Sequence, residues 1–143
     1  MLLRWMGRAR QYPWRWVATP GAVAALAVTF RRLHPRRIVV EGASMGPALE
    51  PGDRLVVLRR RRHRPGHVVA VRDPRRPSRM MVKRVAAVEE GGRLDVRGDD
   101  PAGSTDSRTF GAVPAHLVLG RAVWRYAPSE RAGPVPGAGG GRR

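Results

Sequence analysis

The chain is organised around one stretch, Ile38-Val39-Val40-Glu41-Gly42-Ala43-Ser44-Met45-Gly46-Pro47-Ala48-Leu49-Glu50-Pro51-Gly52-Asp53. Its apolar start predicts a short strand, which Gly42 and Gly46-Pro47 interrupt. Ser44 therefore lies in a tight, irregular turn after a strand. Such a serine is either an ordinary turn residue or a nucleophile, and this stretch taken alone favours the turn residue.

A serine nucleophile needs a general base, and the sequence offers few candidates. His34 and His63 lie in arginine-rich runs, His116 lies in an expected turn, and His67 has no carboxylate nearby to orient it. Lysine is the alternative, because a desolvated lysine can lose its proton near neutral pH whereas arginine cannot. Among the 28 lysines and arginines of the chain, Lys83 is the only lysine.

The surroundings of Lys83 are apolar, in the run Met80-Met81-Val82-Lys83-Arg84-Val85-Ala86-Ala87-Val88. In a strand, Met81, Lys83, Val85 and Ala87 share one face. That face would exclude water from the ammonium group and lower the pKa of Lys83, as a general base requires. The alternative is a lysine on an edge strand whose amine reaches solvent.

A third stretch, residues 98–111, is dense in glycine, proline, aspartate and serine and therefore predicts a loop. Its hydroxyl and carboxylate groups could orient a lysine amine. Taken by itself, however, the composition favours a solvated loop without a chemical role.

Four motifs in this order resemble the conserved boxes of the type I signal peptidases, the S26 family of Ser/Lys serine endopeptidases. They are Ser44-Met45-x-Pro47-x-Leu49, Gly52-Asp53, Lys83-Arg84-Val85 and Gly98-Asp99-x-x-x-x-Ser104-x-Asp106-Ser107-Arg108-x-x-Gly111. The resemblance extends from about Ile38 to Pro128. It implies a mainly β fold, namely a signal-peptidase/LexA-like β-ribbon catalytic core with an N-terminal helix.

The resemblance also implies catalytic roles. Ser44 would be the nucleophile, with its backbone N–H in the oxyanion hole, and Lys83 would be the general base. Ser104 would orient the lysine amine, while Asp106 and Arg108 would hold the loop in shape. Substrates would be precursor proteins with small residues, often alanine, just before the cleavage site and one further position upstream.

Met45 would pack beside the nucleophile and line the substrate site.

Three positions depart from the family pattern: Gly42 replaces a serine found in some members, Asp100 replaces an asparagine, and Gly66-His67 replaces Gly-Asp. The oxyanion hole would then depend on backbone donors, and losing one donor can cost about 10²-fold in rate.

Only a short segment separates Lys83 from Gly98, where larger family members have a long insertion. This compactness, together with Val71-Arg72-Asp73-Pro74, also resembles the nickel-type superoxide dismutase maturation proteases. Removal of signal peptides and maturation of the dismutase both remain open as functions.

The expected organisation has four parts: a basic segment at 1–15, a membrane-anchor helix at 16–33, a catalytic domain at 37–128 and a disordered Pro/Gly-rich tail at 129–143. Strands are expected at 37–41, 54–59, 67–72, 80–89, 93–97 and 117–126, with a turn at Gly91-Gly92. Residues 16–30 carry no charge, but a span of about 20 is usual for a membrane helix, so an interfacial or packed helix is the alternative. We expect a single-pass plasma-membrane protein with its catalytic domain on the outer face; a cytoplasmic protein is the alternative.

The net charge of +17 suggests either nucleic acid or anionic lipid as a partner. The densest basic run, residues 59–64, falls in an expected turn and has no nucleic-acid-binding signature, so membrane lipids are favoured. A self-cleaving Ser/Lys repressor would need a DNA-binding segment that is not seen. No cysteine, metal-ligand spacing or phosphate-binding loop is present, so no metal or cofactor is expected.

Overall fold

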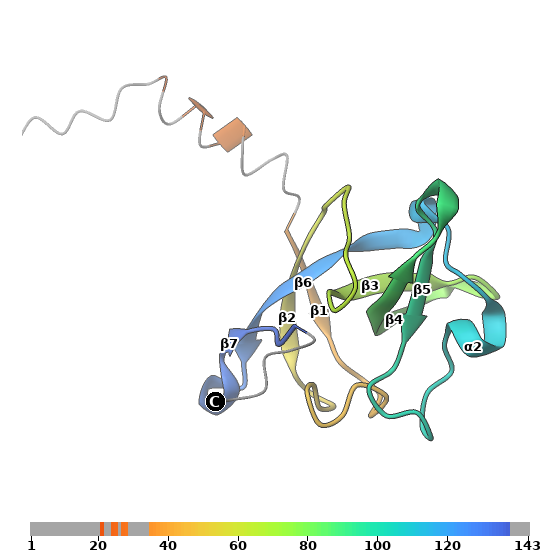
Figure 1. The fold of residues 1–143 in the computed structure, drawn as a ribbon. Helices are drawn as coiled ribbons and strands as arrows, with labels where there is room; N and C mark the ends of the chain where they lie inside the picture. The colour runs from red at the N-terminus through yellow and green to blue at the C-terminus, as the bar shows by residue number, and fades with distance from the viewer. Residues whose placement is uncertain (1–20, 22–23, 26, 29–34, 138–143) are drawn as a thin grey trace, which may run out of the picture.

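The computed structural model describes residues 21, 24–25, 27–28 and 35–137. They form a seven-stranded antiparallel sheet in the order β1-β2-β6-β3-β4-β5, with β7 paired to β6 (Figure 1). The strands are β1 Arg36–Val39, β2 Arg54–Leu58, β3 Val68–Asp73, β4 Arg76–Val88, β5 Leu94–Arg97, β6 Val118–Ala127 and β7 Gly133–Pro134. The helical turns are α2 Ser107–Phe110, η1 Glu90–Gly92, η2 Ala115–Leu117 and η3 Ser129–Arg131. The predicted mainly β fold is confirmed.

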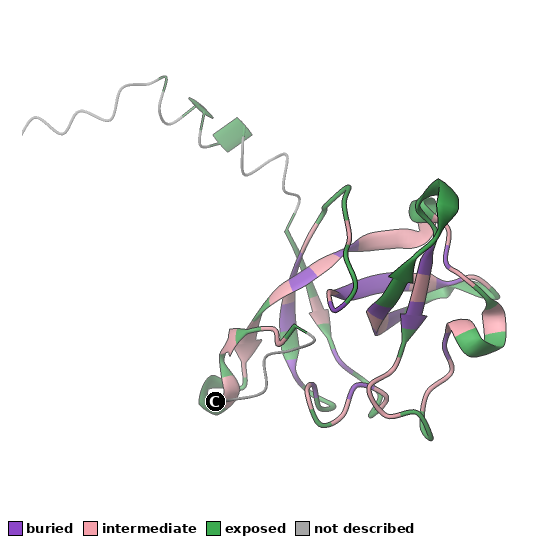
Figure 2. Cartoon of the chain, in the orientation of Figure 1, coloured by how far each residue is buried: buried purple, intermediate pink, exposed green. Residues whose placement is uncertain are grey.

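The buried residues follow the central strands (Figure 2). β3 lies between β4 and β6, and its residues 68–71 are all buried, because a central strand is covered on both faces. One core cluster contains Met45, Leu49 and Leu55, beneath the serine-containing turn. A second cluster contains Val85 and Val96, between β4 and β5.

Strand β4 is longer than the sequence predicts, because it begins at Arg76 rather than Met80. Asp73 accepts a hydrogen bond from the backbone N–H of Arg75 at 2.9 Å, so its carboxylate closes a tight β3–β4 turn. The sequence also predicts that Ala87 shares one face of this strand with Lys83 and Val85. In the structure Ala87 is exposed, whereas Lys83 and Val85 are buried. A register shift between Val85 and Ala87 explains the difference, because the bulge turns the following side chain outward.

The predicted disordered tail requires a correction for residues 129–137. Residues Ser129–Arg131 form η3, and Gly133 and Pro134 pair with Arg125 and Trp124 of β6. Backbone pairing to an otherwise open part of β6 orders a segment whose composition indicates disorder. Residues 138–143 lie outside the described range.

The predicted segments at 1–15 and 16–33 fall almost entirely outside the described residues. The described positions 21, 24, 25, 27 and 28 are helical and exposed. Within the described residues, no helix is both long and apolar enough to cross a membrane.

Candidate active site

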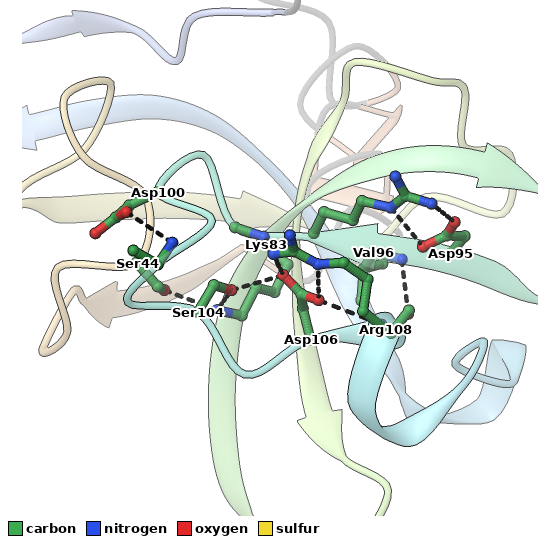
Figure 3. A network of polar contacts seen from close by, with 12 residues as sticks. Ser44, Lys83, Asp95, Val96, Asp100, Ser104, Asp106 and Arg108 are labelled. Carbon is green, nitrogen blue, oxygen red and sulfur yellow. Dashed lines mark hydrogen bonds and ion pairs between the residues drawn. The ribbon is translucent and has the colours of Figure 1, made fainter.

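Ser44 and Lys83 lie together although 39 residues separate them in the chain. Ser44 is in the turn after β1, and Lys83 projects from β4. The Lys83 Nζ atom lies 2.7 Å from Ser44 Oγ (Figure 3). Lys83 is only 3% exposed, so its amine is not the solvent-reaching amine of the alternative interpretation.

Ser104 extends this contact into a chain of hydrogen bonds. Lys83 Nζ donates to Ser104 Oγ at 3.0 Å, and the Ser104 hydroxyl donates to Asp106 Oδ2 at 2.7 Å. Because its proton is directed to the carboxylate, the Ser104 oxygen presents its lone pairs to the lysine. The predicted supporting residue Ser104 thus has the geometry of a group that orients the amine.

Asp106 is completely buried and holds the 98–111 loop from inside. Arg108 donates to both of its oxygens, from Nε at 2.9 Å and from Nη2 at 2.7 Å. The carboxylate also caps α2 through the Arg108 backbone N–H at 3.2 Å and accepts from Gly98 N at 3.0 Å. The Arg108 guanidinium is the main cause that holds the pKa of Asp106 far below its usual range, so this group is ionised.

The environment lowers the pKa of Lys83 below that of an ordinary lysine. Burial is the largest cause, because it penalises the charged ammonium form. The Asp106 carboxylate opposes this shift, whereas the guanidinium groups of Arg79 and Arg108 add to it. An amine with a lowered pKa beside a serine hydroxyl can accept the hydroxyl proton.

Gly98 permits the close packing of the loop against the serine turn. A Cβ atom there would lie 2.3 Å from Ser104 Oγ and 2.5 Å from the Ser44 carbonyl oxygen. The same carbonyl accepts a hydrogen bond from Asp100 N at 3.0 Å. Asp100, one of the departures from the family pattern, therefore contacts the serine turn through its backbone, while its carboxylate accepts from Ala102 N at 3.1 Å.

A groove of about 390 Å³ opens beside Ser44 and Lys83. Its walls are residues 39–45, which begin at the end of β1, and residues 78–83 of β4. Among the described strands, β1 pairs only with β2, and this part of β4 pairs only with β3, so both walls have an open edge. Val39 and Met80 line the groove and are 53% and 56% exposed, so each places an accessible apolar side chain along an otherwise mostly polar lining.

Met45 also lines the groove, but its side chain is 1% exposed and packs into the core. It therefore forms part of the floor beneath the serine turn. Histidine does not occur among the residues that line this groove. In the described part of the chain, His, Cys, Asp and Glu side chains do not group as a metal site would require.

Two ionic networks support the site, and neither was predicted from the sequence. Asp53, 1% exposed, accepts from Arg125 Nη1 at 3.0 Å and from Arg131 Nη2 at 3.3 Å. Arg125 also donates to the Ala48 carbonyl at 3.2 Å, and Arg131 pairs with Glu50. Gly52-Asp53 belongs to a recognised motif, but its arginine partners lie 72 and 78 residues away and leave no local signal.

The second network surrounds Arg84, the neighbour of Lys83. Its guanidinium binds Asp99 through two contacts of 2.7 and 2.6 Å, and it donates to the carbonyl groups of Gly66 and Pro136 at 2.9 Å each. Arg84 therefore joins β4 to the loop that carries Ser104 and to the C-terminal segment. Both Arg84 and Asp99 occur in the quoted motifs, but the motifs did not predict that the two side chains form an ion pair.

Comparison with known proteins finds similarity to one family model and to several named proteases. Residues 13–92, more than half of the chain, match the family model described as signal peptidase, peptidase S26. The chain is 32% identical over 120 residues to mitochondrial ATP-independent inner membrane protease subunit 1b of Arabidopsis thaliana, covering 66% of this chain and 71% of that protein. It is 30% identical over 120 residues to mitochondrial inner membrane protease subunit 2 of Schizosaccharomyces pombe, covering 67% of each. With subunit 1 of Xenopus tropicalis it shares 29% over 128 residues, 73% of this chain and 77% of that protein.

Proposed function

Because this chain belongs to the signal peptidase family, peptidase S26, we propose that it is a serine endopeptidase that removes N-terminal signal or pro-segments from precursor proteins. Ser44 is the nucleophile and Lys83 is the general base in this proposal. The observation that carries it is the 2.7 Å contact between Lys83 Nζ and Ser44 Oγ in a buried setting. Family membership supports a protease of the signal-peptidase type, and the dyad is our assignment.

The reaction begins when neutral Lys83 accepts the hydroxyl proton of Ser44. The Ser44 oxygen attacks the scissile carbonyl carbon, and negative charge develops on the carbonyl oxygen. The backbone N–H of Ser44 makes no hydrogen bond within the described structure, so it is available to stabilise that oxygen. The Lys83 ammonium protonates the leaving amine, and a water activated by the same lysine then hydrolyses the acyl-enzyme.

Ser104, Asp106 and Arg108 act as positioning residues in this scheme. The Ser104 oxygen accepts one N–H of the lysine, which directs the lone pair of the neutral amine toward Ser44. Asp106 fixes the Ser104 hydroxyl, and Arg108 keeps Asp106 ionised. Their contacts support these roles without placing any of them in contact with substrate.

The substrate would be an extended segment bound in the groove between β1 and β4. An extended peptide can form backbone hydrogen bonds with an open strand edge, and both walls offer one. Met45 in the floor limits the depth of the groove near Ser44. A shallow groove fits the small residues that the family resemblance implies before the cleavage site.

We also propose that the chain is membrane-associated through its uncharged run at residues 16–30. The relatives are named as inner membrane proteases of mitochondria, which supports membrane association. Their names do not support the expected plasma-membrane location, so we do not assign this chain to a particular membrane.

A dedicated maturation protease for nickel superoxide dismutase is the alternative within the same chemistry. Its support is the direct β4–η1–β5 connection, which joins the strand of Lys83 to the loop of Ser104 without an inserted domain. A non-catalytic S26 scaffold that binds lipid or nucleic acid is the alternative of another class. The buried Ser44–Lys83 contact argues against that alternative, because a structural lysine rarely stays buried against a serine hydroxyl.

The test is cleavage of a precursor with an Ala-x-Ala site by the full chain in detergent, with products identified by mass spectrometry. Ser44→Ala and Lys83→Arg should both abolish cleavage, the second because arginine keeps its proton. Ser129→Ala, which removes an exposed hydroxyl, is the matched control and should retain activity. Near-normal activity of Lys83→Arg would refute the lysine base. If the wild type leaves this precursor intact, a nickel superoxide dismutase precursor tests the alternative.

A further inference from the structure

A second cavity, of about 360 Å³, lies away from the catalytic groove and has an unusual charge composition. It is lined by four arginines and two histidines, together with apolar residues: Arg36, Arg59, Arg60, Arg61, His63, Gly92, Ala115, His116, Val118 and Leu119. Among the described residues, no carboxylate lines it. Glu89 and Glu90 precede Gly92, but in the described structure neither forms an ion pair with an arginine.

Seven other arginines of the described chain have carboxylate partners, and the remaining eight outside the cavity have none. The seven paired arginines are Arg75, Arg79, Arg84, Arg97, Arg108, Arg125 and Arg131. The four arginines of the second cavity are exposed and form no such pair in the described residues. Like charges gathered around one hollow repel each other, and a bound anion would relieve this repulsion.

One of the two cavity histidines, His63, gives a second observation in favour of a bound anion. The Nδ1 atom of His63 is buried and has no hydrogen-bond partner in the described structure. Burial is the largest cause that lowers the pKa of His63, and an anion bound in the cavity would oppose this shift by favouring the charged imidazolium. Guanidinium groups bind the oxygens of a phosphate group in a forked geometry, which makes phosphate the anion that suits this cavity.

The position of the cavity suggests where the phosphate comes from. Arg36 opens β1 and lies opposite Val57 of β2, close to the point where the 59–67 connection begins. Figure 1 shows this connection at the same end of the sheet as the start of β1, while the segment between β1 and β2, residues 40–53, turns beyond the other end of β1. Arg36 follows the uncharged run 16–30 by six residues, which can span at most about 20 Å.

We propose that this cavity binds the phosphate groups of anionic lipid headgroups and thereby orients the peptidase domain on the bilayer. The inference rests on the membrane association given under the proposed function. With residues 16–30 in the bilayer, Arg36 and the 59–61 arginines lie in the headgroup layer. The catalytic groove, at the other end of β1, stays open to precursor substrates.

The test compares the partition coefficients of the full chain on phosphatidylcholine vesicles with and without phosphatidylglycerol. The ratio of the two coefficients cancels the contribution of the apolar run. The double variant Arg59→Gln/Arg61→Gln should lower this ratio about 30-fold, at roughly one surface arginine contribution for each residue removed. The double variant Arg54→Gln/Arg76→Gln removes the same charge from exposed positions outside the cavity and should change the ratio less than about threefold.

Equal losses in both double variants would overturn the proposal, because the preference would then reflect net charge alone. An unchanged ratio in the cavity variant would overturn it too. Calorimetric titration of the full chain in detergent with inorganic phosphate distinguishes a free phosphate ion from a lipid headgroup as the ligand. If the cavity variant loses phosphate binding but keeps the wild-type vesicle ratio, the cavity binds a free anion and the lipid proposal is overturned.

The outcome is separable from that of the proposed peptidase. The cavity variant should still cleave precursor in detergent without lipid, and Ser44→Ala should keep the wild-type vesicle ratio. If the wild-type chain keeps its lipid preference but cleaves neither the Ala-x-Ala precursor nor the dismutase precursor, the peptidase proposal is refuted and the lipid site remains supported.

Discussion

Replacement of Gly98 by alanine would test the positioning of the proposed dyad without altering any reacting group. The added methyl carbon would lie 2.3 Å from Ser104 Oγ and 2.5 Å from the Ser44 carbonyl oxygen. Nonbonded carbon–oxygen contacts lie at about 3.3 Å or more, so the loop must move by about 1 Å. Gly98 does not have the positive φ that disfavours alanine, so the effect is steric rather than conformational.

A shift of about 1 Å in a catalytic group can cost about 10²-fold in rate. We therefore expect kcat for precursor cleavage to fall about 100-fold, with a smaller effect on KM, because no residue that lines the groove is substituted. Overpacking of this kind costs about 1–3 kcal/mol in the free energy of unfolding. Steady-state cleavage of a fluorogenic peptide and urea unfolding measure the two effects separately.

Gly137→Ala is the control, since a Cβ atom at that position meets no other atom within 4 Å. It should leave both kcat and the free energy of unfolding unchanged. If Gly98→Ala keeps kcat within about threefold of wild type and loses no stability, the loop does not hold Ser104 against Ser44 and the positioning argument fails.

Three further predictions concern charge. The value of kcat/KM should rise with pH as Lys83 loses its proton, with a midpoint below the ordinary lysine value of 10.5. Asp106→Asn should lower that midpoint further, because the carboxylate raises the pKa of Lys83. The pH–rate profiles of both proteins check this, and a midpoint unchanged by the variant would contradict it. The lowered pKa of Asp106 stabilises the fold at pH values above the unfolded pKa of about 4. The difference in Tm between wild type and Asp106→Asn should therefore be largest at neutral pH and shrink as the pH falls below about 4. A difference that calorimetry finds constant with pH would argue against this role. Arg84→Gln should lower the free energy of unfolding by about 1–3 kcal/mol, because it leaves Asp99 without its partner. A double-mutant cycle with Asp99→Asn should show coupling between the two residues. Additive losses of stability would count against the pair.

Much of the architecture was predictable because it depends on local patterns. Alternating apolar residues predicted the six main strands, and Gly91-Gly92, both with positive φ, form the turn before β5 as expected. The bulge near Ala87 and the ordered segment 129–137 were not predictable. Each depends on how one strand aligns with its neighbour, which residue type and periodicity do not specify.

The sequence by itself determined the residue types of the proposed site: a serine in a broken strand, the single lysine in an apolar run, and a loop rich in hydroxyls and carboxylates. Only the tertiary structure decided that Lys83 Nζ lies 2.7 Å from Ser44 Oγ and that Asp53 is held by Arg125 and Arg131. The physical reason is that composition and period are local properties of the chain. A contact between residues 39 or 72 positions apart exists only when the register of the whole sheet brings them together.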